Sequence, residues 1–225
     1  EYLMSKDGGG YKKFYLLGTD YVFPRTANKI LRAFLLHSGV PEENIMVEYT
    51  PFHHQDYQTI VQKIKRFAAD GDAAVLSTIN GDSNVPFYKE FSNQGLTSAM
   101  CPIMAFSVAE DELRSMDTEF LVGHLAAWNY FQSISTPENR AFVKKFKDYC
   151  AKMGLPGGAK RVTDDPIVWS YVGVYLWKKA VEKAVADMAA DMLEIQAIRA
   201  KQPGRAFPPD TPWQKAFEHS FQFDP

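Results

Sequence analysis

The sequence predicts an α/β fold in which a parallel sheet carries helices on both faces. Two observations predict it. Short apolar segments alternate with segments of helical pattern from residue 14 to residue 116. The apolar segments are mostly continuous rather than interleaved with polar residues, which is typical of strands buried on both faces. Strands and helices in this order favour a parallel sheet with right-handed crossovers.

Residues 14–126 contain all the expected strands. They share a short apolar run and are residues 14–17, 44–49, 73–77, 103–106 and 121–126. The helices expected between them are residues 26–37, 57–69, 85–94 and 109–116. Pro24 stands where a first helical turn tolerates proline, because its missing N–H has no partner there. Residues 1–6 look like the end of a helix that the following three glycines stop, so we expect the chain to start within a domain.

The second half is expected to be helical. Thr136 is a good N-cap and Pro137 fits the first turn of a helix that runs to about Met153. Residues 164–166 open a long helix, and residues 181–200 continue with an uninterrupted helical pattern rich in Ala, Met and Glu. After a break at residues 202–205, the remainder has little sheet character. We therefore expect a sheet-bearing lobe over residues 1–180, then a helical extension and irregular tail over residues 181–225.

Composition excludes several classes of protein. The 225 residues carry 25 Lys and Arg against 27 Asp and Glu, so no basic field suggests a nucleic-acid partner. No apolar run approaches the roughly 18 residues that span a membrane, and the first residues do not form a signal peptide. Cys101 and Cys150 have no metal-ligand spacing. They can pair or stay buried and reduced, and burial is the favoured expectation.

Polar and aromatic residues follow the expected strands where each strand ends. In a parallel sheet these ends share one edge, and ligands bind there in open α/β sheets. Amide and hydroxyl groups beside ring faces suit a small neutral polar solute. The candidate ligand-binding residues are Tyr21, Phe23, Asn80, Asp82, Ser107, Glu110 and Trp128.

Each candidate also has a plainer interpretation. Tyr21 and Phe23 can cap the core under a loop rather than touch a ligand. Residues 80–84, Asn-Gly-Asp-Ser-Asn, can be only the turn that begins a helix, because these residue types favour such positions. His124 lies inside an apolar run, and a hydrogen-bonded core histidine is the favoured interpretation.

The sequence predicts no metal, cofactor or catalytic residue. His53 and His54 are adjacent and point different ways in an extended chain, and no carboxylate or Cys stands at ligand spacing, so a loop role is favoured. Ser107 has no G-x-S-x-G context for nucleophilic catalysis. The run of glycines at residues 8–10 precedes a strand rather than following one, so it is not a phosphate-binding loop.

Five segments, in order, resemble the urea and short-chain amide receptors of ABC transporters. The segments are residues 15–28, 76–84, 123–131, 135–139 and 161–166. The resemblance implies one lobe of a type I periplasmic binding fold, in which two lobes close on a solute by a hinge motion. It also implies a non-catalytic receptor outside the cytoplasmic membrane, in the periplasm or at the cell surface, that delivers its solute to an ABC permease.

The same resemblance assigns roles to the candidates. It implies that Tyr21 and Phe23 pack against the solute, and that Asn80 or its neighbours and Ser107 supply polar contacts. Amide-sensing relatives tend to have Tyr where this chain has Phe23, so a hydroxyl is missing here. A site that hydrogen-bonds its solute discriminates sharply, which makes Phe23 relevant to specificity.

The chain departs from this family in two places. The family's first lobe is absent, so half of the pocket is expected to be missing. Residues 184–194 and 207–218 resemble instead the linker before the motor of the bacterial transcription-repair coupling factor, without any ATPase motif. Three other hypotheses therefore stay open: an amide-responsive regulator with a protein partner, a small-amide hydrolase, and a composite chain without function.

Overall fold

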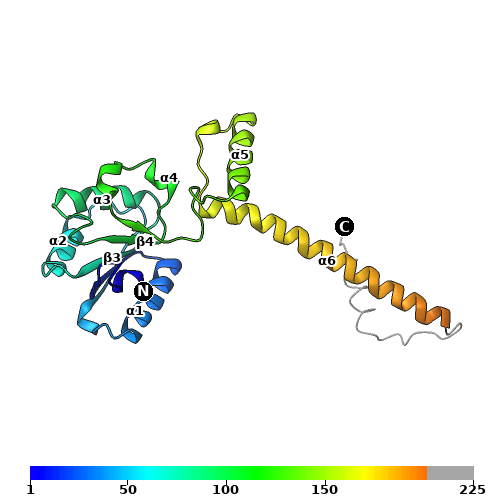
Figure 1. Ribbon diagram of the computed structural model, residues 1–225, viewed down its shortest axis with the longest axis horizontal. Helices are drawn as coiled ribbons and strands as arrows, with labels where there is room; N and C mark the ends of the chain where they lie inside the picture. Colours follow the sequence, from blue (N-terminus) through cyan, green and yellow to red (C-terminus); the bar gives the residue numbers. More distant parts are fainter. Residues whose placement is uncertain (202–225) are drawn as a thin grey trace. The chain divides into compact units, whose positions relative to one another are not determined.

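The computed structural model describes residues 1–201, apart from the side chains of residues 198 and 199. The chain divides into two units, residues 1–169 and a second that starts at Ser170. The first unit contains a five-stranded, entirely parallel sheet in the order β2-β1-β3-β4-β5 (Figure 1). The strands are β1 (Lys13–Thr19), β2 (Ile45–Thr50), β3 (Ala73–Thr78), β4 (Ile103–Ala105) and β5 (Leu125–Ala126).

Helices cover both faces of this sheet, as the sequence predicts. The α-helices of the first unit are α1 (Val22–His37), α2 (Gln58–Phe67), α3 (Asn84–Asn93), α4 (Glu110–Leu113) and α5 (Pro137–Lys152). Short 3-10 turns are η1 (Tyr2–Met4), η2 (Glu42–Asn44), η3 (Gly81–Ser83), η4 (Thr118–Leu121) and η5 (Gly158–Lys160). Helix α6 (Asp165–Lys201) begins in the first unit and forms the described part of the second.

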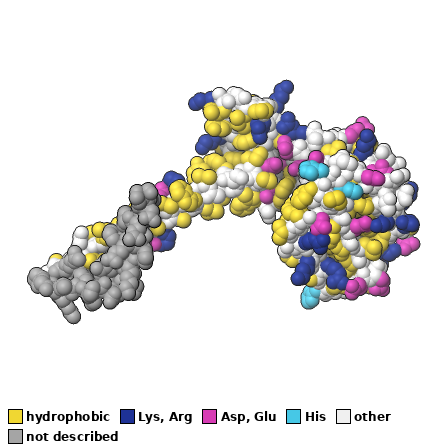
Figure 2. Space-filling model, turned by 180° about the vertical axis from the view of Figure 1, so that it is seen from behind, with side chains coloured by type: hydrophobic (Ala, Val, Ile, Leu, Met, Phe, Trp, Pro, Cys, Tyr) yellow, Lys and Arg dark blue, Asp and Glu magenta, His cyan; other side chains and the backbone are white. Residues whose placement is uncertain are grey.

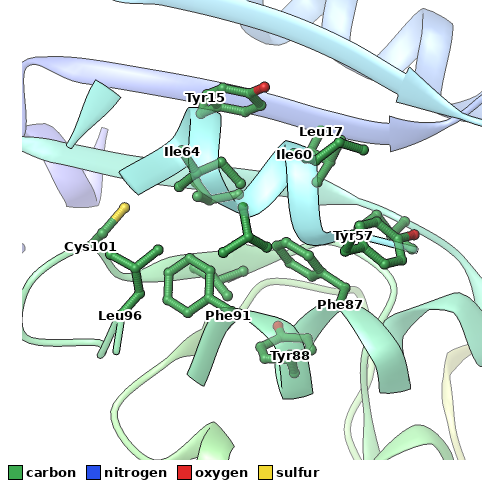
Figure 3. Close-up of a cluster of buried hydrophobic side chains, with 14 of the residues drawn as sticks. Tyr15, Leu17, Tyr57, Ile60, Ile64, Phe87, Tyr88, Phe91, Leu96 and Cys101 are labelled. Carbon is green, nitrogen blue, oxygen red and sulfur yellow. The ribbon is translucent and has the colours of Figure 1, made fainter. Parts of the chain in front are cut away.

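Two hydrophobic clusters lie on opposite faces of β1 and β3. Tyr15 and Leu17 point into a cluster built with α2 and α3, which includes Ile64 and Phe87 (Figure 3). Their neighbours in the strand, Phe14 and Leu16, belong to a second cluster with Leu35 of α1. Successive side chains of a strand point to opposite faces, so a continuous apolar run is what a sheet covered on both faces requires.

Several expected elements are shorter than the sequence suggests. Residues 1–6 contain only the single 3-10 turn η1. Helix α4 stops at Leu113 instead of residue 116, because the following N–H groups bond three residues back, as in isolated turns. Strand β5 is two residues long instead of six. Gly123, at φ 81°, breaks the extended chain there, and a Cβ at this glycine would lie 2.3 Å from the Ser98 hydroxyl.

Other expectations about local structure are confirmed. Thr136 caps α5 by accepting a hydrogen bond from the Asn139 N–H at 3.2 Å, and Pro137 is its first residue. Cys101 and Cys150 are both buried and free. His124 is half-buried, and its Nδ1 accepts a hydrogen bond from the Ile103 N–H at 2.9 Å.

In residues 1–201 the structure contains no helix that is both long and apolar enough to cross a membrane.

Replacing Ile64 with Ala is expected to lower the free energy of unfolding by about 2–5 kcal/mol, because Ile64 is fully buried between α2 and the sheet. Ile30→Ala is the matched control. Ile30 is 64% exposed on α1, so its truncation should cost less than about 0.5 kcal/mol. Urea unfolding followed by circular dichroism gives both values. Equal losses for the two variants would contradict this placement of the core.

Stability is expected to fall as the solution is acidified through the titration of His124. Burial lowers the pKa of His124 from 6.5 to about 4, because it penalises the charged imidazolium. The neutral ring therefore stabilises the fold fully above pH 6.5, and this contribution is lost as the pH falls toward 4. Its slope is roughly 1.4 kcal/mol per pH unit in that window. The wild type should show this slope relative to His124→Gln in unfolding titrations; parallel pH profiles would contradict it.

Candidate ligand-binding site

The carboxyl ends of β1 and β3 are joined through Tyr21 and Asn80. These strands are paired neighbours, with Gly18 opposite Thr78, so their loops leave from adjacent positions. The close approach requires glycine, since a Cβ at Gly18 would lie 2.3 Å from the Thr78 hydroxyl. The Asn80 backbone N–H donates to Thr19 Oγ1 at 3.1 Å, and Asn80 Nδ2 donates to the Tyr21 hydroxyl. The structure thus brings two sequence-predicted residues into direct contact.

Tyr21 is the centre of an exposed aromatic cluster. Its ring centroid lies 4.9 Å from that of Phe52 and 6.2 Å from that of Phe23, with both partner rings tilted. Phe23 and Phe52 are 39% and 54% exposed. We call these three residues the aromatic cluster. It presents ring faces to solvent beside the polar group of Asn80, a combination that orients small molecules in binding sites.

Phe23 lies in the first turn of α1 and not in a loop. The sequence predicts a helix from residue 26, but α1 begins at Val22. Pro24 is therefore the third helical residue, which is still within the turn whose N–H groups have no helical partner. The helix fixes Phe23 beside Tyr21 more firmly than a loop would.

The positive charge of Arg25, close to the aromatic cluster in sequence, is balanced by the carboxylate of Asp20. Arg25 Nε and Nη2 donate to the two carboxylate oxygens of Asp20 at 2.5 and 3.0 Å, and the guanidinium lies 4.8 Å from the Tyr49 ring centroid. The hydrogen bond from Arg25 lowers the pKa of Asp20. Arg25 is thus already engaged by a carboxylate and a ring.

Asp82 lies in η3, two residues after Asn80 in the same loop. Its Oδ1 lies 3.2 Å from His53 Nδ1, within hydrogen-bond and ion-pair distance, and both side chains are largely exposed. His53 has φ 58°, a value that side-chain-bearing residues rarely adopt, and among residues 1–201 it is the one non-glycine residue with positive φ. The contact ties the loop after β2 to η3. The sequence-based interpretation of His53 as a loop residue is consistent with this position.

The remaining candidates occupy the other half of the edge. Ser107 is buried, and its hydroxyl donates to the Ile79 carbonyl at 2.7 Å. Glu110 Oε1 accepts from the Ser133 N–H at 3.2 Å, while its Oε2 is buried without a hydrogen-bond partner. Trp128 is half-buried and lines a groove between α1 and the segments that follow β4 and β5. In the described part of the chain, none of the three forms a hydrogen bond or a ring contact with Tyr21.

An open apolar groove of about 500 Å³ joins Phe23 to Trp128. One wall is α1 and the other is the chain that leaves β4 and β5. The lining residues are Phe23, Ala27, Ile30, Leu31, Phe106, Ala127, Trp128 and Asn129. Phe23 thus belongs both to the aromatic cluster and to this groove, so the two features are continuous.

Sequence reasoning missed Phe52 as a site residue. It follows Pro51 directly after β2, at the same edge as the other candidates, and β2 pairs with β1. Its position after a strand was therefore a usable signal. Its contact with Tyr21 was not, because no local sequence pattern fixes the path of the loop after β2.

Neither Cys101 nor Ser107 is set up as a catalytic nucleophile. Burial raises the pKa of the Cys101 thiol to about 12, which keeps it protonated and unreactive. The Ser107 hydroxyl is directed to a backbone carbonyl rather than to a base. In the part of the chain that the structure describes, no three His, Cys, Asp or Glu side chains gather as a metal site.

Comparison with known proteins decides the family. Residues 1–204 match the family described as periplasmic binding protein domain. This chain belongs to the periplasmic binding protein family. The Leu/Ile/Val-binding protein homolog 6 of Brucella melitensis biotype 1 is 27% identical over 175 residues, which is 77% of this chain and 42% of that protein.

Solved structures of this family share the fold. An amino acid ABC transporter substrate-binding protein from Pseudomonas fluorescens Pf-5 superposes with a TM-score of 0.53 at 17% identity, over 67% of this chain and 39% of that one. A branched chain amino acid ABC transporter periplasmic ligand-binding protein from Burkholderia xenovorans LB400 gives 0.52 at 23% identity, over 70% and 40%. The chain spans about two fifths of the length of these relatives.

A short match to a different protein also exists. The transcription-repair-coupling factor of Mycobacterium bovis is 41% identical over 46 residues, which is 20% of this chain and 4% of that protein. Residues 207–218, part of the segment in which the sequence resembles that factor, lie outside the described residues.

Replacing Asn80 with Leu is expected to raise the pKa of the Tyr21 hydroxyl. Burial already raises it, and the hydrogen bond from the Asn80 amide opposes that rise. Leucine keeps the branched shape of the Asn80 side chain but removes the donor. Titration of ring-labelled tyrosine by NMR measures the shift, with Asn93→Leu on α3 as the control. An unchanged or lower pKa in Asn80→Leu would contradict the contact.

Proposed function

We propose that this chain binds urea or a short primary amide, without catalysis, as part of a receptor that feeds an ABC transporter. The observation that supports the solute class is the Tyr21–Asn80 pair. Because Asn80 Nδ2 donates to the Tyr21 oxygen, the phenolic O–H remains free to donate elsewhere. Asn80 Oδ1 is buried and has no hydrogen-bond partner. The pair therefore has one uncommitted donor and one uncommitted acceptor, and a small shift of the Asn80 side chain would expose the acceptor to a solute.

A primary amide complements that pair. Its carbonyl oxygen accepts from the Tyr21 O–H while its N–H donates to Asn80 Oδ1. A buried oxygen without a partner costs about 1–3 kcal/mol, and a solute N–H that reaches Asn80 Oδ1 recovers that cost. Urea satisfies both atoms in the same way and adds a second NH₂ group.

A carboxylate complements the pair less well. It has only acceptor atoms, so it leaves Asn80 Oδ1 unsatisfied. Arg25 follows Tyr21 by four residues and is a cation that could pair with a solute carboxylate. It already donates two hydrogen bonds to Asp20. Asp82 adds negative charge at the same edge. These features favour a neutral solute over a free amino acid, although the relatives named above are receptors for amino acids.

The other candidates have proposed roles around this pair. Phe23 and Phe52 flank the solute with ring faces, and Trp128 closes the groove that continues from Phe23. Ser107 can accept a hydrogen bond while it donates to Ile79, and Glu110 Oε2 is a second unsatisfied acceptor for the N–H groups of an amide. Phe23 brings no hydroxyl, so it leaves orientation of the solute to Tyr21 and Asn80.

The proposed setting follows from the family. We propose that the solute-binding lobe is residues 1–180, that residues 181–225 are an extension of it, and that the protein works in the periplasm or at the cell surface with a membrane permease. The names of the relatives, an amino acid and a branched chain amino acid ABC transporter receptor, support this setting.

A composite chain is the second candidate. The 46-residue match to the transcription-repair-coupling factor favours it, because a segment of unrelated origin would explain both that match and the change in sequence character near residue 180. In that case residues 1–180 would keep the fold of the lobe, while the extension would contribute nothing to transport.

Calorimetric titration with acetamide, urea and leucine tests the proposed solute. We expect heat with acetamide or urea and none with leucine. Tyr21→Phe and Asn80→Leu should each weaken amide binding at least about tenfold, since each leaves one hydrogen-bonding atom of the solute unpaired. Tyr149→Phe, at an exposed tyrosine on α5, is the matched control and should bind as the wild type does. Binding of leucine alone would overturn the solute class.

A further inference from the structure

Helix α6 exposes far more apolar surface than a solvent-facing helix normally does. Every described residue from 173 to 194 is exposed, and the apolar ones include Trp177 at 69%. Figure 2 shows hydrophobic side chains along the visible part of this helix. Apolar surface of this extent marks an interaction site in soluble proteins.

Part of that surface forms a stripe with a symmetric spacing. The stripe residues are Val174, Trp177, Val181, Ala184, Val185, Met188, Met192 and Ile195. If the adjacent central residues Ala184 and Val185 count as one position, the six steps from Val174 to Ile195 average about 3.5 residues, the repeat of helices that pair in coiled coils. Read from either end, the steps are three, four and three residues to the central Ala184 and Val185. The pattern is therefore nearly the same in both directions.

The two halves of this stretch of α6 carry opposite net charges. Residues 174–184 carry three Lys and one Glu, for a net charge of +2. Residues 185–195 carry two Asp and one Glu, for a net charge of −3. A parallel neighbour with this sequence would place like halves together, whereas an antiparallel neighbour places the basic half beside the acidic half.

We propose that α6 pairs with α6 of a second copy of this chain in an antiparallel helix pair. The two-fold axis passes between Ala184 and Val185. It brings Val181 opposite Met188 of the partner, Trp177 opposite Met192, and Val174 opposite Ile195. Such an interface is isologous, since each contact occurs twice, and a palindromic stripe is what isologous pairing of one helix requires. The small Ala184 at the centre lets the two helices approach closely.

A membrane surface fits this helix less well. Helices that lie on membranes carry an excess of Lys and Arg on their polar face. Residues 174–195 have three Lys against four Asp and Glu, so anionic lipids are not attracted to them. The charge pattern by halves has no role on a membrane but has one in antiparallel pairing.

Analytical ultracentrifugation of the full chain tests the association. Between about 1 and 100 µM the wild type is expected to shift from monomer to dimer, since a micromolar Kd corresponds to about −8 kcal/mol of association free energy. Val181→Asp should weaken association at least about tenfold, because it buries an unpaired carboxylate opposite Met188. Leu193→Asp, on the opposite face of α6, is the control and should associate as the wild type does, with the helix content of both variants checked by circular dichroism.

Crosslinking then tests the direction of pairing. Ala184→Cys places two thiols beside the two-fold axis, so mild oxidation should give a covalent dimer. Val174→Cys places them roughly 30 Å apart in the antiparallel pair, from the 1.5 Å rise per residue, and should not crosslink. The native Cys101 and Cys150 are buried, so the wild type gives the background. A wild type that stays monomeric at 100 µM, or a crosslink through Val174→Cys alone, would overturn the proposal.

Discussion

Parallel pairing of β1 with both β2 and β3 is the constraint on which the rest of the structure depends. Phe14 to Leu17 have almost no solvent exposure, because the strand is flanked on both edges and covered on both faces. Each face of the strand supplies one hydrophobic cluster, with α2 and α3 on one side and α1 on the other. Parallel pairing also directs the carboxyl ends of the strands to one edge, where their loops must meet.

The site at that edge depends on the same register. Gly18 lies opposite Thr78. Asn80 follows Thr78 by two residues, and Tyr21 follows Gly18 by three. The contact between them is therefore set by strand pairing rather than by loop flexibility. Three neighbouring rings and one amide are thereby held together at the carboxyl edge of the sheet.

The sequence was sufficient for the parts of the fold that depend on burial. The continuous apolar runs, alternating with helical segments, predicted five parallel strands, because a sheet covered by helices on both faces buries both sides of such runs. It failed where a single residue changes the backbone path. Gly123 shortens β5, turns replace the end of α4, and α1 starts at Val22 with Phe23 in its first turn. These outcomes depend on contacts with distant segments, such as Ser98 beside Gly123.

The candidate site shows the same division. Its general location followed from the strand ends, and the pairing of Tyr21 with Asn80 agrees with their adjacent strands. Phe52 was not predicted, since its ring contact with Tyr21 depends on the path of the loop after β2, which no local pattern fixes. The groove between Phe23 and Trp128 was not predicted either, because its walls are a helix and the exits of two short strands that no local pattern places together.

Chemical-shift mapping by NMR during titration with acetamide is the most direct test of the account. The account predicts that the side-chain amide of Asn80 and the rings of Tyr21 and Phe52 shift together, while residues at the amino ends of the strands, such as Lys13 and Ala73, do not. Shifts centred on the amino ends, or saturation with no change at Tyr21 and Asn80, would contradict it.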